Sequence, residues 1–304
     1  MTGTSGPGIA LKSEGINLAV MTELPLVVVD VQRVGPSTGI PTKTEQGDLL
    51  QVLFGRNSDS PVCVLAPLSP GDCFYTAIEA VRLAYQFMTP VIILSDSYLA
   101  NTAEPWPVPE MAQLERIPVP LHTDPATFQP YQRDPKTLAR QRVLPGMAGT
   151  EHRIGGLEKA DVTGAVSYDG DNHERMTNLR AEKVGRIAQF LPKVEVEGPA
   201  DADVLVLGWG STRGAILTAV QEARAQGASV ATAHLRHLHP FPPTLGEVVR
   251  RYRKVLIPEN NRGQLRLLVR AAYLVDAVGL NRINGQPFAA AEITSAIQQL
   301  NAQR

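Results

Sequence analysis

Short apolar runs alternate with amphipathic segments in the first hundred residues. The runs at 23–32, 62–66 and 90–96 are rich in Val, Ile and Leu. Such runs are typical of strands that are buried on both faces of a parallel sheet. Between the second and third runs, residues 69–88 repeat apolar side chains every three or four positions, which predicts a helix. Its buried stripe would consist of Phe74, Ile78, Val81, Tyr85 and Met88.

The same alternation returns after residue 200. Strands are predicted at 201–211, 228–238 and 254–260, and helices at 212–227, 245–253, 264–279 and 289–300. Alternating strands and helices predict a mostly parallel α/β sheet, whose ligands usually bind beyond the carboxyl ends of the strands. Pro and Gly interrupt the periodicity near residue 192. We therefore expect a first domain at 1–192 and a second at 193–304.

Between these two units the periodic pattern dissolves. Residues from about 101 to 178 are rich in Pro and polar side chains but also contain aromatic residues and His. Loops longer than about 15 residues inside compact domains tend to be functional or disordered. The aromatic content favours an ordered excursion over the surface of the first domain.

Composition excludes several classes of function. The 304 residues are 43% hydrophobic and 19% charged, with a net charge of −1, so we expect neither nucleic acid nor a membrane as a partner. No apolar run approaches the roughly 20 residues of a membrane span, and the start lacks a signal-peptide pattern, which predicts a cytoplasmic protein. Cys63 and Cys73 are too few for an iron–sulfur cluster, so no metal site is expected in this chain.

Residues 33–42 form the most distinctive loop of the chain. Arg33 follows an apolar strand and precedes Gly35-Pro36-Ser37-Thr38-Gly39-Ile40-Pro41-Thr42, which offers hydroxyls and backbone N–H groups but no acid or base. This composition suits a recess for an anionic ligand. The alternative is an ordinary turn, because Thr42 to Glu45 also reads as a capping box that starts a helix, and Arg33 could pair with a surface acid.

Two further motifs invite a functional interpretation and support it weakly. Gly208, Gly210 and Gly214 follow a strand, but their spacing misses G-x-G-x-x-G and favours a tight turn over a dinucleotide site. An anion contact at the following helix N-terminus remains open. The histidines of 234–239 match neither a metal site nor a catalytic triad, and we expect them to lie at an interface or to bond carbonyl groups.

Several long segments resemble one family, and the resemblance covers nearly the whole chain. The segments "TSGPGIALKSEGINLAV", "RVGPSTGIPTKTEQGDLL", "PVIILSDSYLAN" and "GTEH…NHERMTNLRAEKV" look like alpha subunits of 2-oxoacid:ferredoxin oxidoreductases, especially the 2-oxoglutarate (KorA-like) branch. The resemblance implies an α/β fold. A partial pyrimidine-type domain that binds thiamine diphosphate would precede a transketolase C-terminal-like α/β domain.

The resemblance also implies an activity and its partners. The complex would decarboxylate 2-oxoglutarate oxidatively to succinyl-CoA and pass the electrons to ferredoxin. Thiamine diphosphate and Mg would bind at the interface with a beta subunit, which would also carry the iron–sulfur cluster. Coenzyme A would be the second substrate, while its contacts in this chain, like all cofactor contacts and catalytic residues, stay unassigned.

Family alpha subunits usually carry further segments before "TSGPG", including a substrate loop and the glutamate that activates the cofactor. No residue here inherits those roles, so the chain is expected to lack the usual N-terminal part and to be active only with that part and a beta subunit. The strand within 23–32 would then lie at an open sheet edge.

The resemblance places substrate contact at Arg33 and Thr42, with Ser37 and Thr38 as additional lining residues. The distal carboxylate of 2-oxoglutarate suits a guanidinium, which can donate two parallel hydrogen bonds. Two other functions stay open. The chain could be a noncatalytic assembly or docking subunit, or it could belong to a pyruvate or branched-chain 2-oxoacid oxidoreductase.

Overall fold

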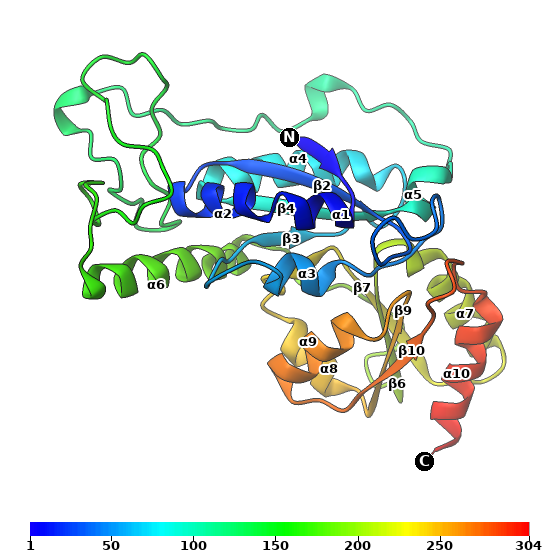
Figure 1. Cartoon of the computed structure of the whole chain (residues 1–304). Helices are drawn as coiled ribbons and strands as arrows, with labels where there is room; N and C mark the ends of the chain where they lie inside the picture. Colours follow the sequence, from blue (N-terminus) through cyan, green and yellow to red (C-terminus); the bar gives the residue numbers. More distant parts are fainter. Residues whose placement is uncertain (304) are drawn as a thin grey trace.

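Two five-stranded sheets organise residues 1–303, the part of the chain that the computed structural model describes (Figure 1). The first sheet has the order β1-β2-β4-β3-β8. Its strands are β1 (Thr2–Thr4), β2 (Leu26–Gln32), β3 (Cys63–Leu65), β4 (Pro90–Asp96) and β8 (His237–His239). The first four strands are parallel, and β8 pairs antiparallel with β3. Because β1 pairs with β2 at Thr2–Thr4, the expected open edge at β2 is wrong.

The second sheet has the order β10-β9-β6-β7-β5. Its strands are β5 (Val196–Glu197), β6 (Val204–Trp209), β7 (Val230–Leu235), β9 (Lys254–Glu259) and β10 (Ala277–Asn281). All pair in parallel except β5 with β7. The α/β fold with parallel sheets is therefore confirmed. The helix predicted at 264–279 is only half right, because the chain turns left-handed at Leu274 (φ 54°) and continues as β10 beside β9.

Helices cover both sheets (Figure 1). They are α1 (Gly6–Leu11), α2 (Ser13–Thr22), α3 (Leu49–Phe54), α4 (Asp72–Phe87), α5 (Ser97–Asn101), α6 (Gly170–Arg186), α7 (Arg213–Ala225), α8 (Leu245–Arg251), α9 (Gln264–Tyr273) and α10 (Ala290–Ala302), with short 3-10 turns η1 (Met111–Gln113), η2 (Pro125–Thr127), η3 (Ile187–Phe190) and η4 (Gly210–Thr212). None of these helices has the length and apolar character to cross a bilayer.

The buried face of α4 differs from the predicted stripe. Its buried side chains are Thr76, Ala80, Leu83, Ala84 and Phe87. Small residues let the helix lie close to the sheet. Of the predicted stripe, Phe74, Ile78, Val81 and Tyr85 are only partly buried, whereas Met88, just after the helix, is buried. Phe74 packs against Trp106 and Tyr85 lies beneath the guanidinium of Arg142, so the Pro-rich excursion covers that second face.

The Pro-rich excursion comprises residues 102–169 and loops out beside the first sheet (Figure 1). It ends earlier than predicted, because α6 begins at Gly170, where the Asp169 carboxylate caps the helix by accepting from Asn172 N at 2.7 Å. Sequence periodicity missed α6 since half of its buried side chains are Arg180 and Lys183, which pair with acids.

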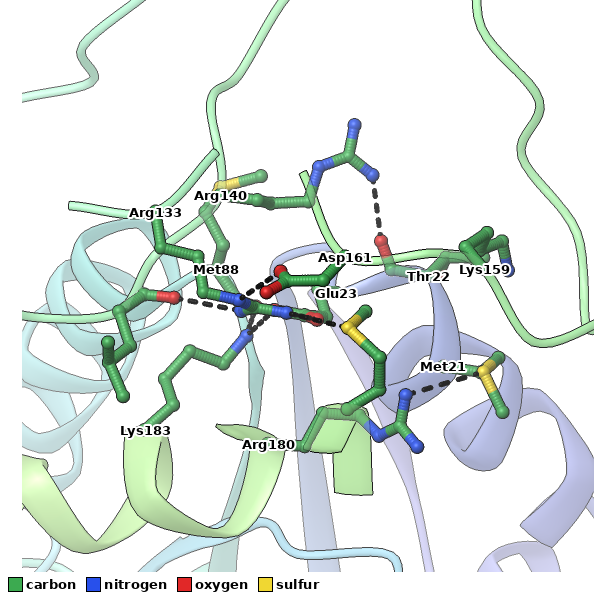
Figure 2. Close-up of polar contacts among 12 residues, drawn as sticks. Met21, Thr22, Glu23, Met88, Arg133, Arg140, Lys159, Asp161, Arg180 and Lys183 are labelled. Atoms are coloured by element: carbon green, nitrogen blue, oxygen red, sulfur yellow. Dashed lines mark hydrogen bonds and ion pairs between the residues drawn. The ribbon is translucent and has the colours of Figure 1, made fainter. Parts of the chain in front are cut away.

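A buried ion cluster anchors the Pro-rich excursion to the first sheet (Figure 2). Glu23, at the end of α2, is 0% exposed and accepts from Arg133 at 2.6 Å and Lys183 at 2.5 Å. Burial alone would raise the pKa of Glu23, but Lys183 and Arg133 together lower it to about 2. Arg133 comes from the excursion and Lys183 from α6, so one carboxylate joins three segments.

The two sheets share one apolar core. Val28 and Ile92 of the first sheet belong to the same buried cluster as Leu205 and Trp209 of the second. On the second sheet, α8 and α9 contribute to this cluster, whereas α7 and α10 cover the opposite face. The loops at the carboxyl ends of the two sheets are consequently held against each other.

Candidate functional site

A cleft of about 770 Å³ opens at the carboxyl ends of strands from both sheets. The loop after β2 forms one wall, and the segments after β9 and β10 form another, together with the start of α1. Its lining residues are Gly6, Pro7, Ala10, Leu11, Arg33, Val34, Gly35, Pro36, Ser37, Glu45, Gly47, Asp48, Gln51, Asn261, Arg262, Gln264 and Ile283. This is where parallel α/β folds usually bind ligands.

Arg33 supplies a cation to this cleft. Its side chain is partly buried, and its Nε is fully enclosed without a hydrogen-bond partner among residues 1–303. The other charged lining residues are Arg262, Glu45 and Asp48. Burial raises the pKa of Glu45, although the hydrogen bond from Gly35 N opposes this. A guanidinium with unused donors in a cleft can grip a carboxylate or phosphate.

The loop after Arg33 brings only part of the predicted site into the cleft. Ser37 lines the cleft, whereas Thr38 and Thr42 are exposed and lie outside its lining. The predicted capping box at 42–45 is wrong: the next helix, α3, starts at Leu49, and Glu45 instead accepts from Gly35 N at 3.1 Å. This carboxylate ties the two ends of the loop together.

Gly39 is required for the loop's shape. Its φ is +53°, and a Cβ built there would lie 1.6 Å from the Val34 carbonyl oxygen. Ile40 N donates to that same oxygen at 3.2 Å, so the chain folds back onto Val34. Ser37 and Thr42 also have positive φ, at 58° and 62°. Only glycine adopts this region without cost, so the backbone here is held by its contacts.

Two buried glutamines hold the loop, and sequence reasoning missed both. Gln32 donates to Ser95 O at 3.0 Å and accepts from Asp48 N at 3.0 Å, which links β4 to the far end of the loop. Gln46 donates to Trp209 O at 2.9 Å and accepts from Asn260 N at 3.0 Å, which links the loop to the second sheet. Both are 0% exposed. The sequence did contain one signal for Gln32, since it is a polar residue at the end of an apolar strand.

The other two motifs are structural. Gly210 has φ +59° and forms the tight turn expected before α7. His234 and His239 bond the carbonyl groups of Gly210 and Val62 at 3.0 and 2.7 Å, as predicted. His237 instead bonds Glu79 at 2.8 Å, across the contact between α4 and β8. None of the three histidines lines the cleft.

Family models match most of the chain. Residues 1–168 match "Pyruvate flavodoxin/ferredoxin oxidoreductase, thiamine diP-bdg", and residues 202–294 match "Pyruvate:ferredoxin oxidoreductase core domain II". A relative from Mycobacterium tuberculosis, 2-oxoglutarate oxidoreductase subunit KorA, is 54% identical across 100% of this chain and 46% of its own length.

Solved structures agree with this grouping. A 2-oxoglutarate:ferredoxin oxidoreductase from Magnetococcus marinus, with 2-oxoglutarate, coenzyme A and succinyl-CoA bound, superposes with a TM-score of 0.93 at 35% identity, over 99% of this chain and 53% of that one. Transketolase from Campylobacter jejuni shares the fold alone, with a TM-score of 0.51 at 9% identity, over 98% of this chain and 35% of that one.

The chain thus spans about half the length of its 54%-identical relative and of the Magnetococcus marinus chain. The family model for the thiamine diphosphate-binding part covers more than half of this chain, and the Arg33 cleft lies mainly within the matched segment. The protein belongs to the pyruvate flavodoxin/ferredoxin oxidoreductase family, with relatives among the KorA subunits of 2-oxoglutarate oxidoreductases.

Proposed function

We propose that this chain is part of the alpha subunit of a thiamine diphosphate-dependent 2-oxoglutarate:ferredoxin oxidoreductase. The complex converts 2-oxoglutarate and coenzyme A to succinyl-CoA and carbon dioxide, and reduces ferredoxin. The observation that carries the proposal is Arg33, a cation in a cleft at the strand ends whose enclosed Nε has no hydrogen-bond partner within residues 1–303. The related structure from Magnetococcus marinus, solved with 2-oxoglutarate bound, supports the choice of substrate.

Arg33 suits the part of 2-oxoglutarate that pyruvate and branched-chain 2-oxoacids lack. The distal carboxylate of this substrate lies two methylene groups from the keto carbon, and a guanidinium can bind both of its oxygens. Ser37 lies in the same lining and offers a hydroxyl donor. Thr42 and Thr38 would reach a substrate only through movement of the exposed loop or through a partner surface above it.

The reacting groups come from outside the described residues. Thiamine diphosphate, when bound, supplies the electron sink for decarboxylation. We place it with Mg at the interface with a beta subunit, and the iron–sulfur cluster on that subunit. Within residues 1–303 no three His, Cys, Asp or Glu side chains are grouped to hold a metal ion. This chain's contribution is to bind and orient the 2-oxoacid.

Reconstitution tests the proposal. The alpha subunit that contains this chain is purified with a beta subunit, and reduction of ferredoxin is followed with 2-oxoglutarate, pyruvate or a branched-chain 2-oxoacid. We expect reduction that requires both 2-oxoglutarate and coenzyme A and that yields succinyl-CoA. A complex that assembles yet neither binds thiamine diphosphate nor reduces ferredoxin would show a docking role instead. Preference for pyruvate or a branched-chain acid would overturn the substrate assignment.

A further inference from the structure

A second feature of the cleft is a pair of carboxyl groups in its wall. Asp48 lines the same cleft as Arg33, and Asp30 lies on β2 outside the lining. Asp30 is 0% exposed, and neither of its carboxylate oxygens has a hydrogen-bond partner among residues 1–303. Both residues belong to the "VVVDVQRVGPSTGIPTKTEQGDLL" stretch, and the substrate contacts proposed above leave both unexplained.

Among residues 1–303, no cation is hydrogen-bonded to Asp30. Asp30 lies opposite Thr4 of β1 and Leu94 of β4, on the face of β2 that packs with Val28 against the apolar core. Neither β1 nor α1 nor α3 contains an ionisable side chain, and Asp96 is the only one on β4. On α2 the only one is Glu14, which is exposed, and the third nearby acid is Glu45. The ionisable groups on these elements are therefore acidic, and the cations Arg33 and Arg262 lie in the cleft that Asp48 lines.

Asp48 lies beside this face of β2, because its backbone N–H donates to Gln32 Oε1 at 3.0 Å and Gln32 follows Asp30 on the same face of the strand. A proton on one of the two carboxyls lets it donate a hydrogen bond to the other. Two ionised carboxylates cannot do this, since both only accept. Gly6 closes the other side, where a Cβ would lie 2.7 Å from the Asp48 oxygens, so the α1 backbone covers the carboxyl. A buried carboxylate without a donor is costly, and one proton supplies the missing donor for both groups.

We propose that Asp30 and Asp48 share one proton in the wall of the Arg33 cleft, and that this proton makes Asp48 a specificity-determining residue for anionic substrates. The part about substrate rests on the proposed function. Three ionised acids, Asp30, Asp48 and Glu45, would outnumber the two cations Arg33 and Arg262. The shared proton removes one negative charge and leaves the Arg33 guanidinium free for the carboxylate of the ligand.

Burial and the neighbouring acid agree with this arrangement. Burial, and next the charge of Asp48, raise the pKa of Asp30, while burial and Glu45 raise the pKa of Asp48. Both directions favour uptake of a proton near neutral pH. As the pH rises and the pair loses this proton, binding of a dicarboxylate should weaken about tenfold, because the added charge lies in the wall of the cleft that Arg33 also lines.

Infrared difference spectroscopy on the full chain detects the proton directly. Near neutral pH the wild type should show the carbonyl stretch of a protonated carboxylic acid, which Asp30→Asn and Asp48→Asn should both lose. Asp59→Asn, which removes an exposed acid, serves as the control and should retain the band. No such band in the wild type, or a band that survives Asp30→Asn, overturns the shared proton. If Asp30→Asn fails to fold, the loss of the band is tested with Asp48→Asn instead.

Binding of 2-oxoglutarate to the assembled complex tests the role in specificity. We expect the wild-type dissociation constant to rise about tenfold from mildly acidic to mildly alkaline pH, and Asp30→Asn to flatten this dependence. Asp30 does not line the cleft, so its replacement removes no contact with the ligand. A pH dependence that persists in Asp30→Asn would assign the effect to Glu45 or to Asp48 alone and overturn the shared proton. If the wild-type complex shows the infrared band but does not bind 2-oxoglutarate, the proposed function is overturned. The shared proton between Asp30 and Asp48 then still stands.

Discussion

Glu23 lies just before β2 and Asp30 lies within it, and these two buried acids meet opposite surroundings. Both are 0% exposed. Glu23 lies between Lys183 and Arg133, which lower its pKa to about 2, whereas burial beside Asp48 raises the pKa of Asp30 to about 8. A buried acid with cations on both sides joins segments of the fold. A buried acid that has no neighbouring cation and lies beside a cleft is a candidate functional residue.

The regions around the two acids differ in the same way: within residues 1–303, charged side chains are paired around Glu23 and unpaired around the cleft. Around Glu23, three segments converge on ion pairs that Figure 2 shows pointing inward from α6 and the Pro-rich excursion. Around the cleft, the Arg33 loop is exposed, and its cation has an unused donor. Substitutions should therefore affect stability in the first region and binding in the second.

The largest effect is expected from Glu23→Gln. The change leaves Lys183 and Arg133 buried without their carboxylate, and breaking a buried ion pair on one side typically costs about 3–5 kcal/mol. Urea unfolding of the full chain near neutral pH measures the loss. Glu182→Gln is the matched control, because its partner Arg186 forms an exposed i,i+4 pair worth at most about 0.5 kcal/mol. Equal effects of the two variants would contradict the comparison.

The pH dependence of stability should have opposite signs at the two acids. The pKa of Glu23 is lowered, so its stabilisation is present above the ordinary value of 4.5 and is lost as the pH falls toward about 2. The pKa of Asp30 is raised from 3.8, so stability is lost as the pH rises toward about 8.

Asp30→Asn should therefore gain about 1–3 kcal/mol relative to wild type between mildly acidic and mildly alkaline pH. Urea unfolding at both pH values gives this difference, with Asp59→Asn as the control. A variant whose stability runs parallel to wild type over this range would show that Asp30 is ionised throughout or has a partner.

A smaller effect is expected from Gly39→Ala in the Arg33 loop. The new Cβ would collide with the Val34 carbonyl and force the loop to shift, at a cost of about 1 kcal/mol, or about fivefold in the dissociation constant for 2-oxoglutarate. The free energy of unfolding should fall by no more than this ~1 kcal/mol, since the loop is exposed. Gly35→Ala in the same loop is the control, because its Cβ would meet nothing within 4 Å. A similar loss of affinity in both variants would show that the collision is not the cause.

Local patterns predicted most of the fold. The apolar runs located β2, β3, β4, β6, β7 and β9, since strands buried on both faces leave a continuous signature. Sequence could not predict the pairing of β8 with β3, because it depends on contacts between residues more than 170 positions apart, such as Leu65 and His237. It also missed α6, whose buried cations look like a solvated face until Glu23 and Glu158 are placed beside them.

The candidate site was predictable in part. Arg33 stood out as a charge at the end of an apolar strand, and the structure places it in the cleft. Gln32, Gln46 and Asp30 did not stand out, because their roles come from the second sheet and from Asp48 rather than from neighbours in sequence. The exposed position of Thr42 likewise follows from the loop's positive φ values, which composition alone does not reveal.

The central claim is that Arg33 binds the distal carboxylate of 2-oxoglutarate. In the assembled complex, Arg33→Leu should cost about 2–5 kcal/mol and lower kcat/KM for 2-oxoglutarate more than tenfold, while pyruvate, which lacks that carboxylate, is affected far less. Arg33→Lys should fall between, keeping the charge without the planar grip. The measurement is the ratio of the two specificity constants. The account predicts a fall of more than tenfold in this ratio; an unchanged ratio, with both activities reduced equally and the fold intact, would contradict it.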